Sequence, residues 1–160
     1  PDIAFLLSYW LDRRQKDLPP LRGSMDPGDF PHLLPRIAVM EVVPEAKRFR
    51  FRYRLTGSEI VTRIGRDPTG YFFEDIYFGE DLAETQRLYN HLRQTGRAYA
   101  SHARYFVGKT KDNLLIYDRL ILPLRSRADI LSVDQFMLLI VVVEQTGSFQ
   151  PVGSFWQPKR

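Results

Sequence analysis

The chain has 160 residues, of which 44% are hydrophobic and none is cysteine. This length and apolar content suit one domain with a single core, and the lack of cysteine excludes disulfides, zinc thiolate sites, thiol catalysis and cysteinyl-flavin photochemistry. Lysine and arginine outnumber aspartate and glutamate by 23 to 19, and the resulting net charge of +4 does not by itself indicate a nucleic-acid partner.

The apolar segments of the chain are short. The longest, residues 136–143, is well below the roughly 20 residues that a membrane-spanning helix needs. No basic-then-apolar signal segment opens the sequence, so we expect a cytoplasmic protein without a membrane span. The sequence begins at Pro1 and not at methionine, which leaves open whether further residues precede it.

Residues 1–35 are expected to form an amphipathic helix followed by a proline-rich connector. Asp2 is the expected N-cap of the helix, and Pro19 and Pro20 follow its end. The apolar residues of the helix have the spacing of one face: Ile3, Leu6, Leu7, Trp10 and Leu11. We expect this face to cover a sheet, either the sheet of its own chain or a surface shared with a second copy in a homodimer.

Two strands and two helices are expected next. Residues 37–43 are apolar at nearly every position, residues 49–55 alternate between arginine and apolar side chains, and residues 44–47 are the expected loop between them. Ser58 is the expected cap of a short helix that ends at Gly65, and a second helix over residues 81–95 is expected to end at Gly96.

Three further strands complete an expected five-stranded antiparallel sheet. They cover residues 98–107, 114–124 and 136–144. The first and last strands are apolar on both faces and therefore belong in the centre, which predicts the strand order 2-1-5-4-3 in an α+β fold. Residues 36–145 then form the core of the domain, and residues 146–160 are a C-terminal tail.

Five stretches of sequence carry a resemblance to a known family. They are Met25-Asp26-Pro27, Leu33-Leu34-Pro35-Arg36, Phe51-Arg52-Tyr53-Arg54-Leu55-Thr56-Gly57, Gly65-Arg66-Asp67-Pro68-Thr69-Gly70 and Tyr117-Asp118-Arg119-Leu120-Ile121-Leu122-Pro123-Leu124. Their order and spacing over residues 9–144 resemble a family of small, single-domain PAS proteins found mainly in alphaproteobacteria. The resemblance implies a bacterial stand-alone sensor or interaction domain in signal transduction, often without an assigned ligand, and carries over no catalytic residue.

An aromatic-rich interior suggests a ligand pocket between the sheet and the helices. The expected lining consists of Tyr53, Ile64, Phe72, Phe73, Tyr89, Leu92, Tyr105, Tyr117 and Met137. Aromatic clusters also fill solid cores, and that alternative stays open. If a cavity exists, the tyrosine hydroxyls are expected to orient a small, mostly apolar ligand.

A row of arginines on the second strand offers a different function. Arg48, Arg50, Arg52 and Arg54 recur at every second residue and so share one side of the strand. Charges of this kind protect an edge strand from aggregation, and we favour that role over contact with nucleic acid or another anionic surface, which remains the alternative function.

Catalytic and metal chemistry find little support in the sequence. His32, His91 and His102 lack the short spacings of a zinc site, so no metal site is expected. His91 lies on the second helix, from which some PAS domains supply a haem ligand. We do not expect haem ligation here, because nothing else in the sequence specifies a porphyrin site. An enzyme using Asp118 or Glu74 as a base is the weakest alternative, and we expect a non-enzymatic regulatory module that acts through a partner protein, itself or a small ligand.

Overall fold

The computed structural model describes residues 1–107 and 113–146, with the side chains of residues 105–107 and 113 also outside the description. The expected C-terminal tail therefore lies almost wholly outside the described residues. The elements in chain order are α1 (Asp2–Asp12), the short 3-10 helices η1 (Arg22–Ser24), η2 (Pro27–Asp29) and η3 (Pro31–Arg36), β1 (Ile37–Glu45), β2 (Arg48–Thr56), α2 (Ser58–Ile64), α3 (Phe73–Ile76), α4 (Gly79–Thr95), β3 (Tyr99–Val107), β4 (Asn113–Leu124) and β5 (Gln135–Thr146).

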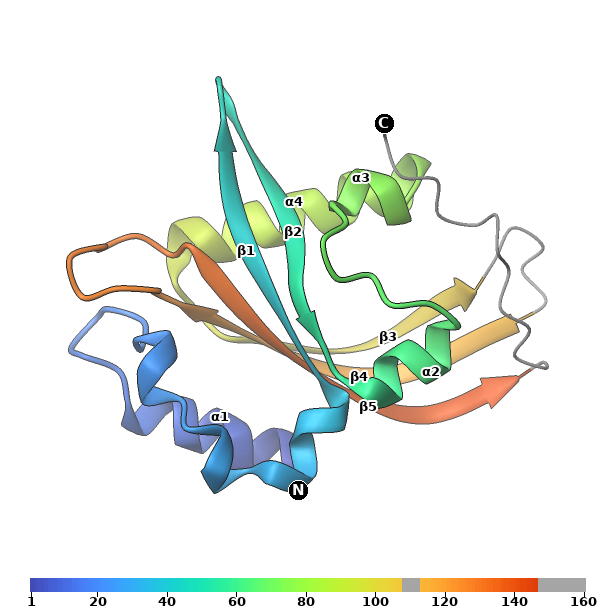
Figure 1. Ribbon diagram of the computed structural model, residues 1–160, viewed down its shortest axis with the longest axis horizontal. Coiled ribbons are helices and arrows are strands. Elements are labelled where there is room, and N and C mark those ends of the chain that lie inside the picture. Colours follow the sequence, from blue (N-terminus) through green and yellow to red (C-terminus); the bar gives the residue numbers. More distant parts are fainter. Residues whose placement is uncertain (108–112, 147–160) are drawn as a thin grey trace.

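The five strands form one antiparallel sheet in the order β2-β1-β5-β4-β3, as the sequence predicted (Figure 1). The two most apolar strands, β1 and β5, are neighbours, and Val39 lies opposite Met137 in their register. The loop between β1 and β2 is shorter than expected. Pro44 and Glu45 still belong to β1, and only Ala46 and Lys47 form the turn.

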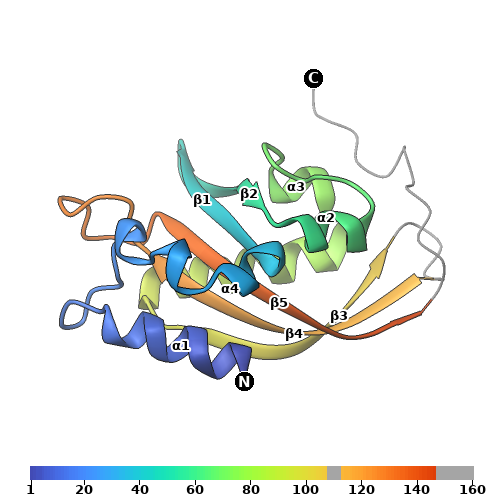
Figure 2. The same ribbon diagram turned by 60° about the horizontal axis from the view of Figure 1, so that its bottom comes forward.

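The sheet is covered on both faces because its central strands are apolar on both. Ala38 and Met40 face α2, α3 and α4, whereas Ile37 and Val39 face α1 and the connector. This alternation follows from the period of two in a strand. Figures 1 and 2 show α1 and α4 on opposite sides of the sheet. The N-terminal segment is thus packed onto the same sheet as the core and does not stand apart from it.

Helix α1 covers the sheet of its own chain. Trp10 is buried and donates a hydrogen bond from Nε1 to the backbone oxygen of Pro123 in β4, at 2.9 Å. Leu6 is buried and Ile3 and Leu7 are partly buried on the same face, whereas Leu11 is exposed. The second face of the sheet is therefore covered by a helix of the same chain.

The expected N-caps were both wrong by one residue. Asp2 is already the first residue of α1, and its carboxylate forms an ion pair with Arg36 at 2.9 Å. Ser58 is likewise the first residue of α2, and Gly57 occupies the cap position. A Cβ atom at Gly57 would overlap the carbonyl oxygens of Leu34 and Pro35, so close contact between backbones explains the glycine.

The expected helix ends at Gly65 and Gly96 are confirmed. Both glycines adopt the left-handed conformation, with φ of 82° and 63°, directly after α2 and α4. Only glycine reaches this region without a steric penalty, which is why it ends helices so often. Helix α3 was not expected, because a single turn of four residues carries no detectable periodicity.

A buried arginine holds the connector against the sheet. Arg125, at the end of β4, is only 1% exposed and donates side-chain hydrogen bonds to the backbone oxygens of Pro19 and Ile130 and to Oε1 of Gln15, at 2.8–3.1 Å. All three acceptors are uncharged. Because Gln15 and Pro19 follow α1, this side chain fixes where the N-terminal segment lies on the sheet.

The outer edge of β2 is partly covered by the segment that follows α2. The backbone nitrogen of Tyr53 donates to the oxygen of Tyr71, and the nitrogen of Gly70 donates to the oxygen of Tyr53. Such pairing removes free donors and acceptors from an edge strand and so protects it from aggregation. Over the described part of the chain, no helix is both long and apolar enough to cross a membrane.

Candidate ligand cavity

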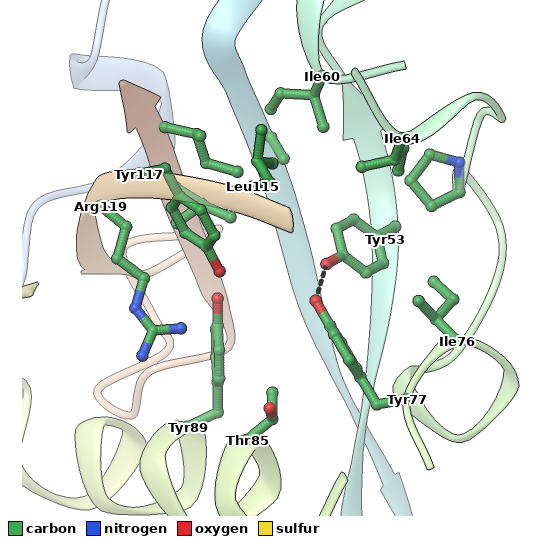
Figure 3. Close-up of a pocket in the computed structure, with 14 residues that line it drawn as sticks. Tyr53, Ile60, Ile64, Ile76, Tyr77, Thr85, Tyr89, Leu115, Tyr117 and Arg119 are labelled. Carbon is green, nitrogen blue, oxygen red and sulfur yellow. Dashed lines mark hydrogen bonds between the residues drawn. The ribbon is translucent and has the colours of Figure 1, made fainter. Parts of the chain in front are cut away.

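A cavity of about 60 Å³ lies between the sheet and the helices α2, α3 and α4 (Figure 3). The sheet and all three of these helices contribute residues to its wall. The lining residues are Ala38, Tyr53, Ile60, Ile64, Pro68, Ile76, Tyr77, Thr85, Tyr89, Leu115, Tyr117, Arg119, Leu138 and Ile140. A volume of this size accommodates a few water molecules or a small organic group.

A larger vestibule of about 400 Å³ adjoins the cavity between α4 and the strands β3 and β4. Tyr77, Thr85, Tyr117 and Arg119 line both spaces. The vestibule is lined in addition by Asp81, Glu84, Leu88, Ala103 and Arg104. The apolar interior therefore connects to a polar opening, with Arg119 at the boundary.

Four tyrosine side chains bring their hydroxyl groups into the cavity. The hydroxyls of Tyr53 and Tyr77 lie 2.9 Å apart and share a hydrogen bond. Those of Tyr89 and Tyr117 point toward one another across the cavity (Figure 3). Burial raises the pKa of each of these tyrosines, and that of Tyr117 rises to about 12. All four hydroxyls therefore keep their protons at neutral pH.

Tyr89 brings a hydroxyl to the wall of the cavity. The residue is 3% exposed and its ring packs in the core, with its centroid 4.9 Å from that of Phe73 and 5.0 Å from that of Phe136. Among the described residues no group forms a hydrogen bond with its hydroxyl. A hydroxyl that faces a cavity without a protein partner can bind a ligand or water, so it marks a candidate binding site.

Arg119 brings a positive charge to the edge of the cavity. It is half-buried, and its Nε donates a hydrogen bond to Oγ of Ser101 at 2.8 Å. Its guanidinium lies 5.7 Å from the ring centroid of Tyr99. None of the carboxylates in the described part of the chain forms an ion pair with it. The charge is balanced only by neutral dipoles.

A solid aromatic core lies beside the cavity, so both interpretations of the aromatic residues hold in part. The rings of Phe51, Phe73, Tyr89 and Phe136 pack against one another, mostly edge to face, with centroids 4.9–6.2 Å apart. Leu92 is buried in the same cluster. Phe73 and Leu92 therefore fill the core and do not line the cavity.

Other residues expected in the cavity lie elsewhere. Tyr53, Ile64, Tyr89 and Tyr117 line it as predicted. Met137 lies on the opposite face of the sheet among the residues under α1, because it alternates with the cavity residue Leu138. Phe72 lies outside the cavity, with its ring 3.6 Å below the guanidinium of Arg50. The side chain of Tyr105 lies outside the described residues.

Sequence reasoning missed several lining residues, of which Tyr77 and Arg119 matter most. Arg119 lies two residues after Tyr117 in β4, so the period of two places both side chains on one face. That pattern was available in the sequence. Tyr77 follows the short helix α3, and only the tertiary structure brings it to Tyr53.

The arginine row on β2 is largely neutralised. Arg48 pairs with Glu45, Arg50 with Glu45 and Glu74, and Arg52 with Glu41. Arg54 is exposed and has no carboxylate partner among the described residues. Ion pairs of this kind reduce the positive potential that an anionic surface would meet.

The histidines and the carboxylates considered for catalysis lie away from the cavity. His91 is exposed on α4, and His32 is exposed near Asp2. His102 and Asp118 are 2.7 Å apart and alternate in β3 and β4 with residues that line the vestibule or cavity, so they face the other side of the sheet. Glu74 is bound to Arg50 at 2.8 Å. The described residues contain no cluster of three or more metal-ligating side chains.

These observations define an α+β domain in which one antiparallel sheet and its connecting helices enclose a small cavity. A family model described as a PAS domain matches residues 2–136, and the chain belongs to the PAS domain family. The matched range includes α1 and the connector as well as the sheet. Searches among curated proteins and among solved structures gave no match. Membership of the PAS family makes the chain a sensory or regulatory module.

Proposed function

We propose that this module senses a small, largely apolar molecule in the cavity between the sheet and α4. The observation that carries the proposal is the hydroxyl of Tyr89, which points into the cavity and has no hydrogen-bond partner among the described residues. A net hydrogen bond is favourable by about 0.5–1.5 kcal/mol. A bound molecule that pairs with this hydroxyl gains a contribution of that order.

The rest of the lining supports an apolar body for the ligand. Ile60, Ile64, Ile76, Leu138 and Ile140 surround the space on several sides. Pockets for small molecules are usually of this kind, mostly apolar with a few polar groups that fix the orientation of the ligand. The adjoining vestibule gives such a molecule a route from solvent.

The proposed output is a change in a protein–protein contact. Cavity residues Leu138 and Ile140 alternate in β5 with Leu139 and Val141, which pack on the opposite face beside α1. A shift of β5 on ligand binding therefore reaches α1 directly. The outer face of α1 exposes Phe5 and Leu11, which supports this helix as the contact with a signalling partner or with a second copy.

The proposed module acts without catalysis. The carboxylates considered as bases, Asp118 and Glu74, do not line the cavity. The alternative of anionic-surface binding has weaker support, because three of the four arginines on β2 pair with carboxylates.

A cavity-filling variant with a matched control tests the sensing proposal. Ile140→Phe enlarges a side chain that lines the cavity, and Val143→Phe makes a similar change at an exposed position of the same strand. The probes are 4-methylpentan-1-ol and cyclohexanol, with binding followed by saturation-transfer NMR. We expect binding to the wild type and to Val143→Phe, and its loss in Ile140→Phe. Equal binding to all three proteins, or no binding to the wild type, contradicts the proposal.

Light scattering on a size-exclusion column tests the self-association alternative. A second copy as the partner predicts a dimer that Leu11→Glu disrupts. A monomer at all concentrations leaves a different signalling protein as the proposed partner.

A further inference from the structure

We propose that the cavity binds a small monocarboxylate whose carboxylate group pairs with Arg119 and whose branched apolar body enters the cavity. This inference rests on the proposed sensing function and assigns a chemical class to the ligand. It uses the charge at the boundary of the cavity and the unpaired hydroxyl within it.

The first argument is the missing counter-ion of Arg119. Its contacts are with Oγ of Ser101 and with the tyrosines Tyr99 and Tyr117, none of which is a carboxylate. No carboxylate of the described residues pairs with it. A negatively charged partner stabilises a partly buried cation more than neutral dipoles do. A ligand carboxylate supplies the missing charge.

Other arginines of this chain that are shielded from solvent have either uncharged acceptors, as the buried Arg125 does, or carboxylates. Arg50 is similarly shielded from solvent and forms ion pairs with both Glu45 and Glu74. Arg119 differs from it in lining the cavity and in forming no ion pair with a described carboxylate. The unpaired position thus coincides with the place where a ligand can enter.

The second argument is that the polar groups around the cavity are donors. The guanidinium of Arg119 donates only, and the protonated hydroxyls of Tyr89 and Tyr117 have protons to donate. The hydroxyl of Thr85 already donates to the backbone oxygen of Asp81 at 2.7 Å. An ionised carboxylate is an acceptor only, with sites for several donors, and charge-assisted hydrogen bonds of this kind are the strong ones.

The third argument is the size and character of the space. The inner cavity of about 60 Å³ corresponds to about four or five water-sized volumes, which suits an apolar group of about four to six carbon atoms. Ile60, Ile76 and Leu138 offer it apolar walls. A longer chain exceeds the inner space and leaves apolar surface in the vestibule.

The vestibule also contains charges that bear on the choice of ligand. Asp81 and Glu84 are exposed on α4, with Arg104 also exposed on β3. Solvent and salt screen charges at such exposed positions more strongly than at the half-buried Arg119. An α-amino acid, whose ammonium group can meet Asp81 or Glu84, is therefore the competing ligand and forms one arm of the test.

The experiment compares three molecules with one carbon skeleton by isothermal titration calorimetry at neutral pH. The probes are 4-methylpentanoate, its neutral amide 4-methylpentanamide, and leucine, which adds an ammonium group. We expect the wild type to bind 4-methylpentanoate roughly 10- to 100-fold more tightly than the amide, the range that a charge-assisted hydrogen bond provides. Arg119→Gln is expected to remove that preference, whereas Arg127→Gln, a change at an exposed arginine paired with Asp129, retains it.

Each outcome has a defined meaning. Equal or tighter binding of the amide by the wild type overturns the carboxylate assignment, needs no variant for its interpretation and leaves the sensing proposal intact. Leucine binding more than 10-fold more tightly than 4-methylpentanoate overturns the monocarboxylate in favour of an amino acid. A carboxylate preference that survives in Arg119→Gln overturns the role of Arg119. If no probe binds and the alcohols also fail to bind, the sensing proposal falls as well.

Discussion

Replacing Tyr89 by phenylalanine removes a single oxygen atom from the wall of the cavity. The ring stays in its contacts with Phe51, Phe73 and Phe136, so the packing of the core is preserved. Among the described residues the lost hydroxyl has no hydrogen-bond partner. The substitution therefore isolates the contribution of one hydroxyl that faces the cavity.

The expected effect on stability is unusual in sign. A wholly desolvated unpaired hydroxyl is unfavourable by about 1–3 kcal/mol, but that of Tyr89 faces the cavity, where water offsets most of this. We expect Tyr89→Phe to change the free energy of unfolding by between zero and about 1 kcal/mol, in the stabilising direction. Most substitutions of buried residues are destabilising, so this result would be informative.

Tyr53→Phe is the matched control. Tyr53 is also a buried tyrosine of the cavity wall, but its hydroxyl shares a hydrogen bond of 2.9 Å with that of Tyr77. Removing it breaks that bond, and we expect a loss of about 1 kcal/mol. The two variants, identical in chemistry, should differ by about 1–2 kcal/mol.

Urea unfolding monitored by tryptophan fluorescence measures the difference. With an unchanged m value, the midpoint is expected to stay or rise in Tyr89→Phe and to fall in Tyr53→Phe. If Tyr89→Phe is destabilised as much as Tyr53→Phe, the hydroxyl of Tyr89 has a partner in the folded protein. The argument for an unfilled polar site in the cavity then fails.

Four further outcomes are expected. Burial raises the pKa of Tyr117 to about 12 from its usual value near 10, so the folded chain holds this proton more tightly than the unfolded chain. The free energy of unfolding should therefore be constant below pH 10 and fall by about 2–3 kcal/mol as the pH rises to 12. Urea unfolding at a series of alkaline pH values measures this loss. Arg125→Met leaves three acceptors unpaired and should lower the free energy of unfolding by about 3 kcal/mol, and a loss under 1 kcal/mol argues against the role of Arg125 in holding the connector. Gly57→Ala should destabilise by about 2–3 kcal/mol in the same assay through overlap with backbone oxygens, whereas no loss would mean that η3 moves freely. Arg52→Gln removes one positive charge beside Glu41, so the retention on a heparin column at low salt should fall only as much as in Arg127→Gln, and a clearly larger loss would support the anionic-surface alternative.

Local patterns in the sequence were sufficient for most of the fold. The apolar character of β1 and β5 on both faces placed them side by side in the centre, and the structure confirms the complete strand order. Gly65 and Gly96 marked the helix ends because their conformation is a local property of glycine. The caps at Asp2 and Ser58 were each misplaced by one residue, since several polar residues near a helix start compete for that position.

The candidate cavity was predictable in part for the same reason. Tyr53, Tyr89 and Tyr117 come from elements whose inward faces follow from period two or period 3.6, and they do line the cavity. The prediction that Met137 lines the cavity was wrong because β5 is apolar on both faces, and its sequence pattern does not distinguish the residues that face α4 from those that face α1. The register with β1, in which Met137 lies opposite Val39, decides that question.

The sequence by itself determined the class of fold, the order of the strands and the presence of an aromatic interior, because these depend on local periodicity and on the burial of apolar side chains. Only the tertiary structure decided which hydroxyls and charges remain without partners. These contacts depend on distances between residues that are remote in sequence. Examples are the ion pair between Arg50 and Glu74 and the hydrogen bond between Tyr53 and Tyr77. The same holds for Tyr89 and Arg119, which have no such partner among the described residues. Hydrogen bonds and ion pairs act over a few ångströms in space, and no spacing along the chain specifies which groups will meet.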